Sequence, residues 1–199
     1  MTWQAAWEEG RTPWDAGQSA PILPTVLDTL PTGRALVPGA GSGYDVLTLA
    51  SSERSVVGLD LAPVAKTRFE QLAQGHPHRD QVEFVVGDAF AYGPDTPFDL
   101  IWDYTFLCAL PPELRPKWLE MVDRVLAPHG QLVALIFPVV PDADPNEGPP
   151  YPMSPELVAD LVAPILEPIS VVPVEQSNPG REGKEWLGRY RRRSSPDAV

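Results

Sequence analysis

The stretch RALVPGAGSGYDVLTLA, residues 34–50, decides how this chain folds. It opens with apolar residues, alternates glycines at Gly39, Gly41 and Gly43, and then resumes an apolar pattern. A short strand that leads into a glycine turn and a helix leaves backbone N–H groups free beside the positive end of the helix dipole. The stretch therefore predicts a ligand-binding turn between a strand and a helix.

The spacing of the glycines does not match two common nucleotide-binding motifs. A dinucleotide fingerprint, G-x-G-x-x-G, requires glycine where this chain has Tyr44. A phosphate-binding P-loop requires Gly-Lys-Ser/Thr, which does not follow. The remaining pattern is G-x-G-x-G with Asp45 at the start of the helix, and the rest of the chain must indicate the ligand.

Strand-like and helix-like patterns alternate along the chain. Apolar runs typical of buried strands occupy residues 34–38, 55–60, 82–88, 98–103 and 131–138, and helical patterns occupy residues 61–75 and 112–127. This alternation predicts a doubly wound α/β fold, Rossmann-like, with parallel strands and helices on both faces. A proline-rich loop at 141–152, a helix at 154–163 and β-like segments at 169–174 and 186–192 complete a mostly parallel sheet of seven strands.

The composition predicts one domain and excludes some partners. With 199 residues, 43% of them hydrophobic, the chain is long enough for one sizeable core, so we expect a single domain over residues 1–199. A net charge of -12 argues against nucleic acid or an anionic membrane as the main partner, and the arginines at 189 and 191–193 suit a solvated strand end. With one cysteine and no leader-like N-terminus, we expect a soluble, cytoplasmic monomer.

Three carboxylates follow strands whose ends should meet at one edge of the sheet. Asp60 follows the second strand, Asp88 the third, and Asp103 and Tyr104 the fourth. Asp60 is spaced to accept hydrogen bonds from a ribose diol, and Asp88 could accept one from an exocyclic adenine amine. Aspartates at strand ends also form turns and cap helices. As a set they describe an adenosine site without a phosphate-binding lysine, which S-adenosylmethionine fits.

Motifs along nearly the whole chain carry a family resemblance. The segments W…W…G…TPWD.G, RALVPGAGSGYDV, VVGLD, FDLIWDYTFLCALPPELRPKW, EGPPY and KEWLGRYRRR resemble the thiopurine S-methyltransferase superfamily, and within it the halide and thiol methyltransferases. The resemblance implies a class I methyltransferase fold that uses S-adenosyl-L-methionine, releases S-adenosyl-L-homocysteine and needs no metal. The chain departs from the family at Ala40, where many relatives carry cysteine, and in a longer proline-rich loop before Tyr151.

The resemblance also implies a set of site residues. Residues 1–20 would fold over the cofactor as a tryptophan-rich lid, since aromatic faces attract a sulfonium; Trp3 and Trp7 also have the spacing of an amphipathic helix. Residues 194–199 are expected to be a disordered tail. The cofactor-binding residues would be Trp3, Trp7, Trp14, Gly39, Gly41, Asp60, Asp88, Ala89, Asp103 and Tyr104. The substrate pocket would be formed by Trp14, Phe106 and Tyr151, with Tyr104 positioning the substrate.

No residue is singled out as a general base. His76, His78 and His129 lie in polar turns, no Asn-Pro-Pro-Tyr motif for amine methylation is present, and Cys108 is expected in the core. The acceptor should therefore be a soft nucleophile that is already anionic, such as a thiolate, hydrosulfide, thiocyanate, a heavy halide or a thiopurine. The alternatives are a small-molecule O- or N-methyltransferase, a nicotinamide-dependent oxidoreductase and a non-catalytic cofactor-binding module.

Overall fold

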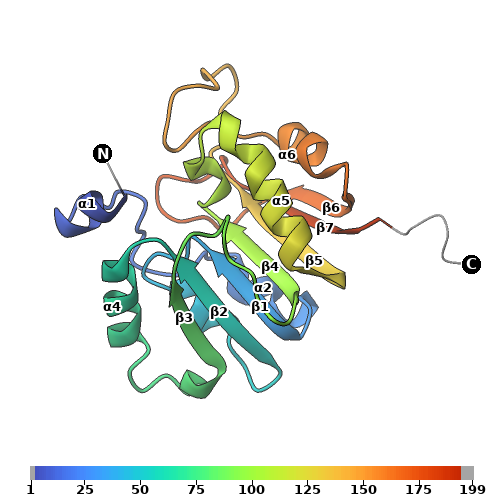
Figure 1. The fold of residues 1–199 in the computed structure, drawn as a ribbon. Coiled ribbons are helices and arrows are strands. Elements are labelled where there is room, and N and C mark those ends of the chain that lie inside the picture. The colour runs from blue at the N-terminus through green and yellow to red at the C-terminus, as the bar shows by residue number, and fades with distance from the viewer. Residues whose placement is uncertain (1–2, 194–199) are drawn as a thin grey trace, which may run out of the picture.

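A computed structural model describes residues 3–193, so the expected tail at 194–199 and the first two residues of the expected lid lie outside it. Seven strands form one sheet in the order β3-β2-β1-β4-β5-β7-β6 (Figure 1). All neighbouring pairs are parallel except those made by β7, which runs antiparallel to β5 and β6. The strands are β1 (Gly33–Pro38), β2 (Arg54–Asp60), β3 (Val82–Val86), β4 (Phe98–Tyr104), β5 (Leu126–Ile136), β6 (Leu166–Pro173) and β7 (Trp186–Arg192).

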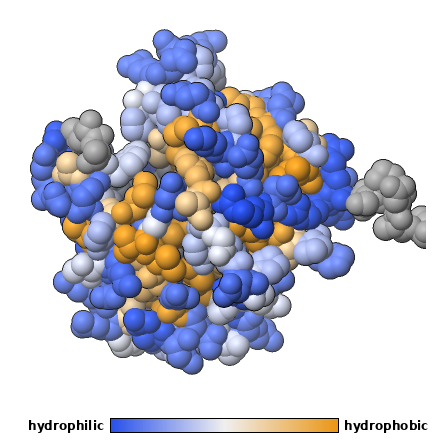
Figure 2. All heavy atoms as spheres, in the orientation of Figure 1, coloured by the Kyte–Doolittle hydropathy of each residue, from blue (hydrophilic) through white to orange (hydrophobic). Residues whose placement is uncertain are grey.

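The winding direction of the sheet reverses beside β1. The chain proceeds outward from β1 to β3 and then returns to place β4 on the other side of β1. In an open α/β sheet, ligands bind outside the carboxyl ends of the strands at such a reversal. Figure 2 shows hydrophobic residues gathered on the surface between α1 (Trp3–Glu8) and α5 (Arg115–Val125), where these strands end.

Helices cover both faces of the sheet. On one face, buried residues of α2 (Leu23–Val26), α3 (Tyr44–Leu49) and α4 (Pro63–Leu72) join a core cluster with side chains from β1, β2 and β4. On the other face, α5 and α6 (Pro155–Val162) pack on the alternate residues of the same strands. A period of two along each strand sends successive side chains to opposite faces, which is why both faces are apolar. The predicted doubly wound fold is confirmed.

The element boundaries follow local chemistry. β7 spans the predicted residues, and α6 begins after Ser154, whose side chain accepts a hydrogen bond from the backbone N–H of Leu157 at 3.1 Å. The predicted boundary before β5 was wrong: α5 ends at Val125 and the strand begins directly at Leu126. The pairing of β4 with β5 shifts register between Phe98 and Leu100, and such an irregularity accommodates Pro128, which has no N–H to donate.

The described part of the chain contains no helix long and apolar enough to span a bilayer. The C-terminal arginines lie on β7 or directly after it and are paired: Arg191 contacts Glu167 at 2.8 Å and Arg192 contacts Asp123 at 2.6 Å. These ion pairs tie β7 to β6 and to α5.

Candidate active site

A cavity of about 510 Å³ opens at the carboxyl ends of the central strands. This volume is within the range of small-molecule sites. Its wall comes from four parts of the chain: the N-terminal segment 3–18, the glycine turn, the residues that end β2, β3 and β4, and loop residues at 137, 149–150 and 179–181. The cavity therefore lies where the sheet reverses its winding.

The glycine turn lets rings lie against its backbone. Gly39 has a φ of +61°, and a Cβ there would lie 2.6 Å from the ring of Phe106. Gly41 has a φ of +54° and approaches the indole of Trp7. Gly43 has a φ of +82°, and a Cβ there would lie 2.4 Å from the ring of Phe69 on α4. Gly43 thus provides the close packing of the turn on α4, and the other two glycines leave the cavity side open.

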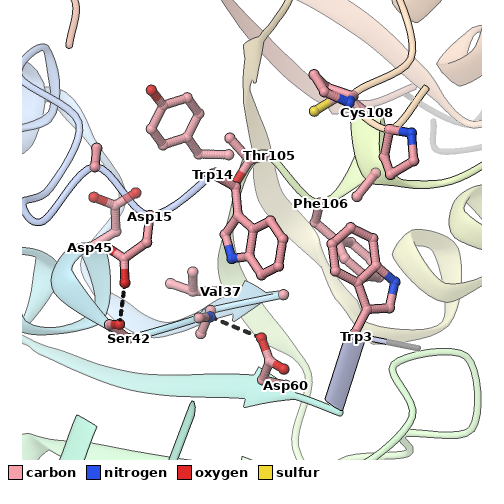
Figure 3. A pocket seen from close by; sticks show the side chains of 18 of the residues that line it. Trp3, Trp14, Asp15, Val37, Ser42, Asp45, Asp60, Thr105, Phe106 and Cys108 are labelled. Atoms are coloured by element: carbon pink, nitrogen blue, oxygen red, sulfur yellow. Dashed lines mark hydrogen bonds between the residues drawn. The ribbon is translucent and has the colours of Figure 1, made fainter. Parts of the chain in front are cut away.

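Asp60 ends β2 beside this turn. One carboxylate oxygen accepts the backbone N–H of Gly41 at 2.9 Å (Figure 3), and the other accepts that of Ala62 at 2.9 Å. Burial raises the pKa of Asp60, and these backbone hydrogen bonds oppose the shift. The carboxylate is fixed at the cavity wall with further lone pairs available, so it fits the diol of a ribose.

Asp88 and Ala89 line the cavity after β3. Asp88 is exposed and one of its oxygens accepts the backbone N–H of Phe90 at 2.9 Å, while Ala89 is buried. Asp88, Asp60 and the glycine turn follow three adjacent strands, so the predicted adenosine residues line one continuous wall.

The three N-terminal tryptophans form one cluster over the cavity. The ring of Trp14 contacts that of Trp3 at a centroid distance of 5.1 Å and that of Trp7 at 5.8 Å, both edge to face. Trp7 is buried, and the guanidinium of Arg68 lies 4.6 Å from its ring centroid. Trp3 and Trp14 reach into the cavity beside Asp60 and Phe106 (Figure 3).

Polar contacts hold the N-terminal segment at both ends of the cavity. Asp15 accepts the hydroxyl of Ser42 in the glycine turn at 2.8 Å (Figure 3) and lies 3.6 Å from Arg68. At the other end, the side chain of Gln18 donates to that of Asn178 at 2.8 Å, and the guanidinium of Arg181 donates to the carbonyl of Trp14 at 2.8 Å. The segment therefore joins the two sides of the cavity.

Asp103 is not placed as predicted. Only 3% of it is exposed, it does not line the cavity, and both oxygens are used within the protein. They accept the backbone N–H of Leu107 at 3.1 Å and the indole N–H of Trp118 at 2.7 Å. Burial raises the pKa of Asp103 to about 6. Successive side chains of a strand point to opposite faces, so Asp103 faces α5 while Tyr104 faces the cavity.

Tyr104 lines the cavity and its hydroxyl lies in a polar network. The hydroxyl donates to a carboxylate oxygen of Glu185 at 2.7 Å and accepts from Asn178 at 3.3 Å and from Arg181. Only 1% of Glu185 is exposed. Burial raises the pKa of Tyr104 well above its ordinary value, so the phenol remains neutral at physiological pH.

Tyr151 also differs from the prediction. The cavity is lined by its neighbours Pro149 and Pro150 instead, and the backbone N–H of Tyr151 donates to the carbonyl of Cys108 at 2.7 Å. Phe106 does line the cavity, as does Cys108, whose thiol is buried and whose pKa is raised by burial to about 12. The loop thus contributes Pro149 and Pro150, and not Tyr151, to the wall.

Three charged residues escaped the sequence analysis: one lines the cavity and two lie outside its lining. Arg181 lines the cavity, with its guanidinium 5.0 Å from the ring centroid of Tyr104 and 4.7 Å from that of Phe137. Glu185 lies behind Tyr104, and Arg115, 8% exposed, has two buried nitrogens without a hydrogen-bond partner. Desolvation lowers the pKa of Arg115. Glu185 belongs to the motif KEWLGRYRRR, which suggested kinship but carried no chemical pattern of its own, and Arg181 lies three residues before this motif.

Histidines and metal ligands do not contribute to this cavity as the structure describes it. None of His76, His78 and His129 is among the residues that line it. Within residues 3–193, no group of three or more histidine, cysteine, aspartate or glutamate side chains is arranged to hold a metal ion.

Comparisons with known proteins point to one family. Residues 1–186 match the family described as Thiopurine S-methyltransferase (TPMT). A probable thiol methyltransferase 2 from Arabidopsis thaliana is 40% identical over 196 residues, which cover 97% of this chain and 85% of that protein. Thiocyanate methyltransferase 1 from the same plant is 40% identical over 96% of this chain and 84% of that protein. A thiopurine S-methyltransferase from Xanthomonas axonopodis pv. citri is 32% identical, covering 75% of each chain.

Solved structures agree in fold at lower identity. The 1,6-didemethyltoxoflavin-N1-methyltransferase of Burkholderia thailandensis superposes with a TM-score of 0.75 at 20% identity, covering 96% of this chain and 85% of that one. A TehB-like SAM-dependent methyltransferase from Corynebacterium glutamicum gives a TM-score of 0.68 at 21% identity, covering 95% and 99%. The fold is that of class I methyltransferases.

Proposed function

Because the chain belongs to the thiopurine S-methyltransferase family and is an S-adenosylmethionine-dependent methyltransferase, we propose that it methylates a small, soft, anionic acceptor. Thiolates, hydrosulfide, thiocyanate, heavy halides and thiopurines belong to this class. Family membership decides against the nicotinamide-dependent oxidoreductase and against the non-catalytic module.

The residues of the cavity fit the cofactor. Asp60 supplies a fixed carboxylate for the ribose. A Cβ at Gly39 would collide with the ring of Phe106, so glycine at this position lets backbone and ring lie together at the cavity wall. Trp3 and Trp14 offer aromatic faces to a positively charged group. When bound, S-adenosylmethionine supplies a methyl group on a positively charged sulfur.

The acceptor side of the cavity carries the proposal. Phe106, Phe137 and Cys108 make it apolar, while Arg181 brings a guanidinium to the same wall. This charge attracts an anion, and the apolar side chains exclude the water that would hydrate it. The loss of hydration increases the reactivity of the anion. The neighbouring phenol of Tyr104 and thiol of Cys108 both have raised pKa values, so neither is an ionised base at neutral pH. The acceptor therefore arrives already ionised, and the protein aligns it.

A panel of acceptors tests this proposal. The purified protein is assayed with thiocyanate, iodide, an alkyl thiol, a thiopurine, a phenol and an amine. We expect the soft anions and thiols to give the highest kcat/KM. Preferred methylation of the phenol or the amine would instead support the O- or N-methyltransferase alternative.

A charge variant tests the part played by Arg181. Arg181→Met keeps an apolar stem of similar length and should lower kcat/KM for thiocyanate by roughly tenfold to a hundredfold, because a charge-assisted contact contributes about 1.5–3 kcal/mol. Lys184→Met removes a positive charge from the same loop at an exposed position and should leave kcat/KM nearly unchanged. Equal effects of the two substitutions would contradict a local role for Arg181.

A further inference from the structure

We infer that Asp45 binds the α-ammonium group at the amino-acid end of the cofactor. This inference rests on the proposed function, because it presumes that S-adenosylmethionine occupies the cavity. Asp45 is the second residue of α3, directly after the glycine turn, and lines the cavity on the same side as Ser42 (Figure 3).

The order of the strands fixes the direction in which the cofactor extends. Along the sheet edge, β3, β2, β1 and β4 present in turn Asp88, Asp60, the glycine turn and Tyr104. With adenine near Asp88 and ribose at Asp60, the amino-acid end continues past the glycine turn toward β4. Asp45 lies at that position, since its carboxylate accepts the indole N–H of Trp102 on β4 at 2.8 Å.

The charge of Asp45 is not neutralised by an ion pair in the described structure. Its two oxygens accept one neutral donor each: the indole of Trp102 and the backbone N–H of Ala20 at 2.9 Å. Burial raises the pKa of Asp45; Arg181 opposes this shift and Glu185 adds to it. A carboxylate has about four lone-pair positions, so each oxygen can accept a further hydrogen bond. A ligand ammonium would offset the cost of burying this charge.

The test must distinguish ammonium binding by Asp45 from a purely structural role of this residue. Through Ala20 and Trp102, Asp45 also joins the end of the N-terminal segment to β4. Loss of that connection would disturb the whole cavity and weaken every ligand. Loss of an ammonium contact would weaken only ligands that carry the amino group.

Calorimetry with two ligands makes the distinction. S-adenosylhomocysteine carries the amino-acid end, and 5′-methylthioadenosine carries the same nucleoside and sulfur without it. Asp45→Asn should weaken S-adenosylhomocysteine binding by roughly tenfold to a hundredfold, as expected for a charge-assisted hydrogen bond, and change 5′-methylthioadenosine binding less than about twofold. As a contrast, Asp88→Asn, at the adenine end, should weaken both ligands alike.

A ligand analogue tests the inference on the unsubstituted protein, so the test remains possible even if Asp45→Asn folds poorly. An S-adenosylhomocysteine analogue with hydrogen in place of the amine should bind the unsubstituted protein as weakly as S-adenosylhomocysteine binds Asp45→Asn, and the two changes together should cost no more than one. Equal loss of both ligands on Asp45→Asn, or full affinity for the analogue on the unsubstituted protein, would overturn the role of Asp45. Failure of the unsubstituted protein to bind S-adenosylhomocysteine at all would count against the proposed function instead.

Discussion

The carboxylate of Asp60 accepts the backbone N–H of Gly41 at 2.9 Å, so the acidic end of β2 holds the glycine turn that follows β1. Two neighbouring strands thereby share one hydrogen bond at the edge where the ligand enters. The surface that we propose for the cofactor depends on this contact as well as on the carboxylate itself.

Replacing Asp60 should therefore weaken cofactor binding. Asp60→Ala leaves ribose hydroxyls and the Gly41 N–H without their acceptor, and it should reduce the affinity for S-adenosylhomocysteine by about 1–3 kcal/mol. Calorimetry measures this change, and Asp60→Asn, which retains one acceptor oxygen, should lose less. An Asp60→Ala variant that binds like the unsubstituted protein would contradict the ribose assignment.

The lid should be loosened by a change on α4. Arg68→Gln removes the guanidinium from the ring of Trp7 and from Asp15, so residues 3–18 should open more often. Proteolysis after the exposed Arg11 should become faster, and S-adenosylhomocysteine should slow it in both proteins. Lys66→Gln, two residues earlier on α4, serves as the charge-matched control. Equal cleavage with and without ligand would argue against a lid.

The rate of methyl transfer should depend on pH only through the ionisation of the acceptor. Burial raises the pKa of Cys108 to about 12 and also raises that of Tyr104, so neither group titrates between about pH 7 and 9. With thiocyanate the rate should be nearly constant over this range, whereas with an alkyl thiol it should follow the thiolate fraction. A bell-shaped profile shared by both acceptors would reveal an acid or base of the enzyme.

Stability should fall as the pH rises from about 4 to 6. The pKa of Asp103 is about 6 in the folded protein, against an ordinary value of 3.8, so within this window the folded state binds a proton that the unfolded state has released. The stabilisation is fully present below about pH 4 and lost above about pH 6, and amounts to at most about 3 kcal/mol at 1.36 kcal/mol per pKa unit. Asp45 and Asp60, whose pKa values are also raised, contribute in the same direction.

Asp103→Asn checks this assignment. It removes the titrating group and leaves either the Leu107 N–H or the Trp118 indole facing an amide donor, so it should lower the free energy of unfolding by about 1–3 kcal/mol at neutral pH. Its unfolding free energy should also change less between pH 4 and 6. Urea titrations at several pH values measure both effects, and an unchanged slope would assign the pH dependence to other groups.

Two glycines with similar backbone angles allow the effects of packing and of backbone strain on stability to be measured separately. Gly43 and Gly75 have φ values of +82° and +73°, but only at Gly43 would a Cβ meet a neighbour, the ring of Phe69. Both alanine variants pay about 1–2 kcal/mol for the left-handed conformation, and Gly43→Ala should lose a further 1–3 kcal/mol, roughly, from overpacking. Unfolding in urea compares them; equal losses would show that Phe69 moves aside.

The fold could be predicted from the sequence because the periodicity of apolar residues indicates which side chains are buried. The near-continuous apolar run of β2 and the glycine turn after β1 predict the strands and the edge at which the cavity opens. Asp103 and Tyr104 were harder, since adjacent strand residues face opposite sides and the pattern did not say which one faces the ligand. Arg181 and Glu185 come from a loop with no periodicity, and their role depends on long-range contacts with Tyr104.

Because β7 is antiparallel, two separate parts of the chain supply residues to the cavity. Because β7 runs opposite to its neighbour β5, the loop that precedes it, residues 174–185, reaches the same edge as the ends of the parallel strands. The residues that we propose for cofactor binding come from the first half of the chain, whereas Asn178, Arg181 and Glu185 lie on this single hairpin. An exchange of this hairpin would therefore replace one wall of the cavity and the contacts that hold Trp14 and Gln18, while Asp60, Asp88 and the glycine turn would keep their places on the parallel strands.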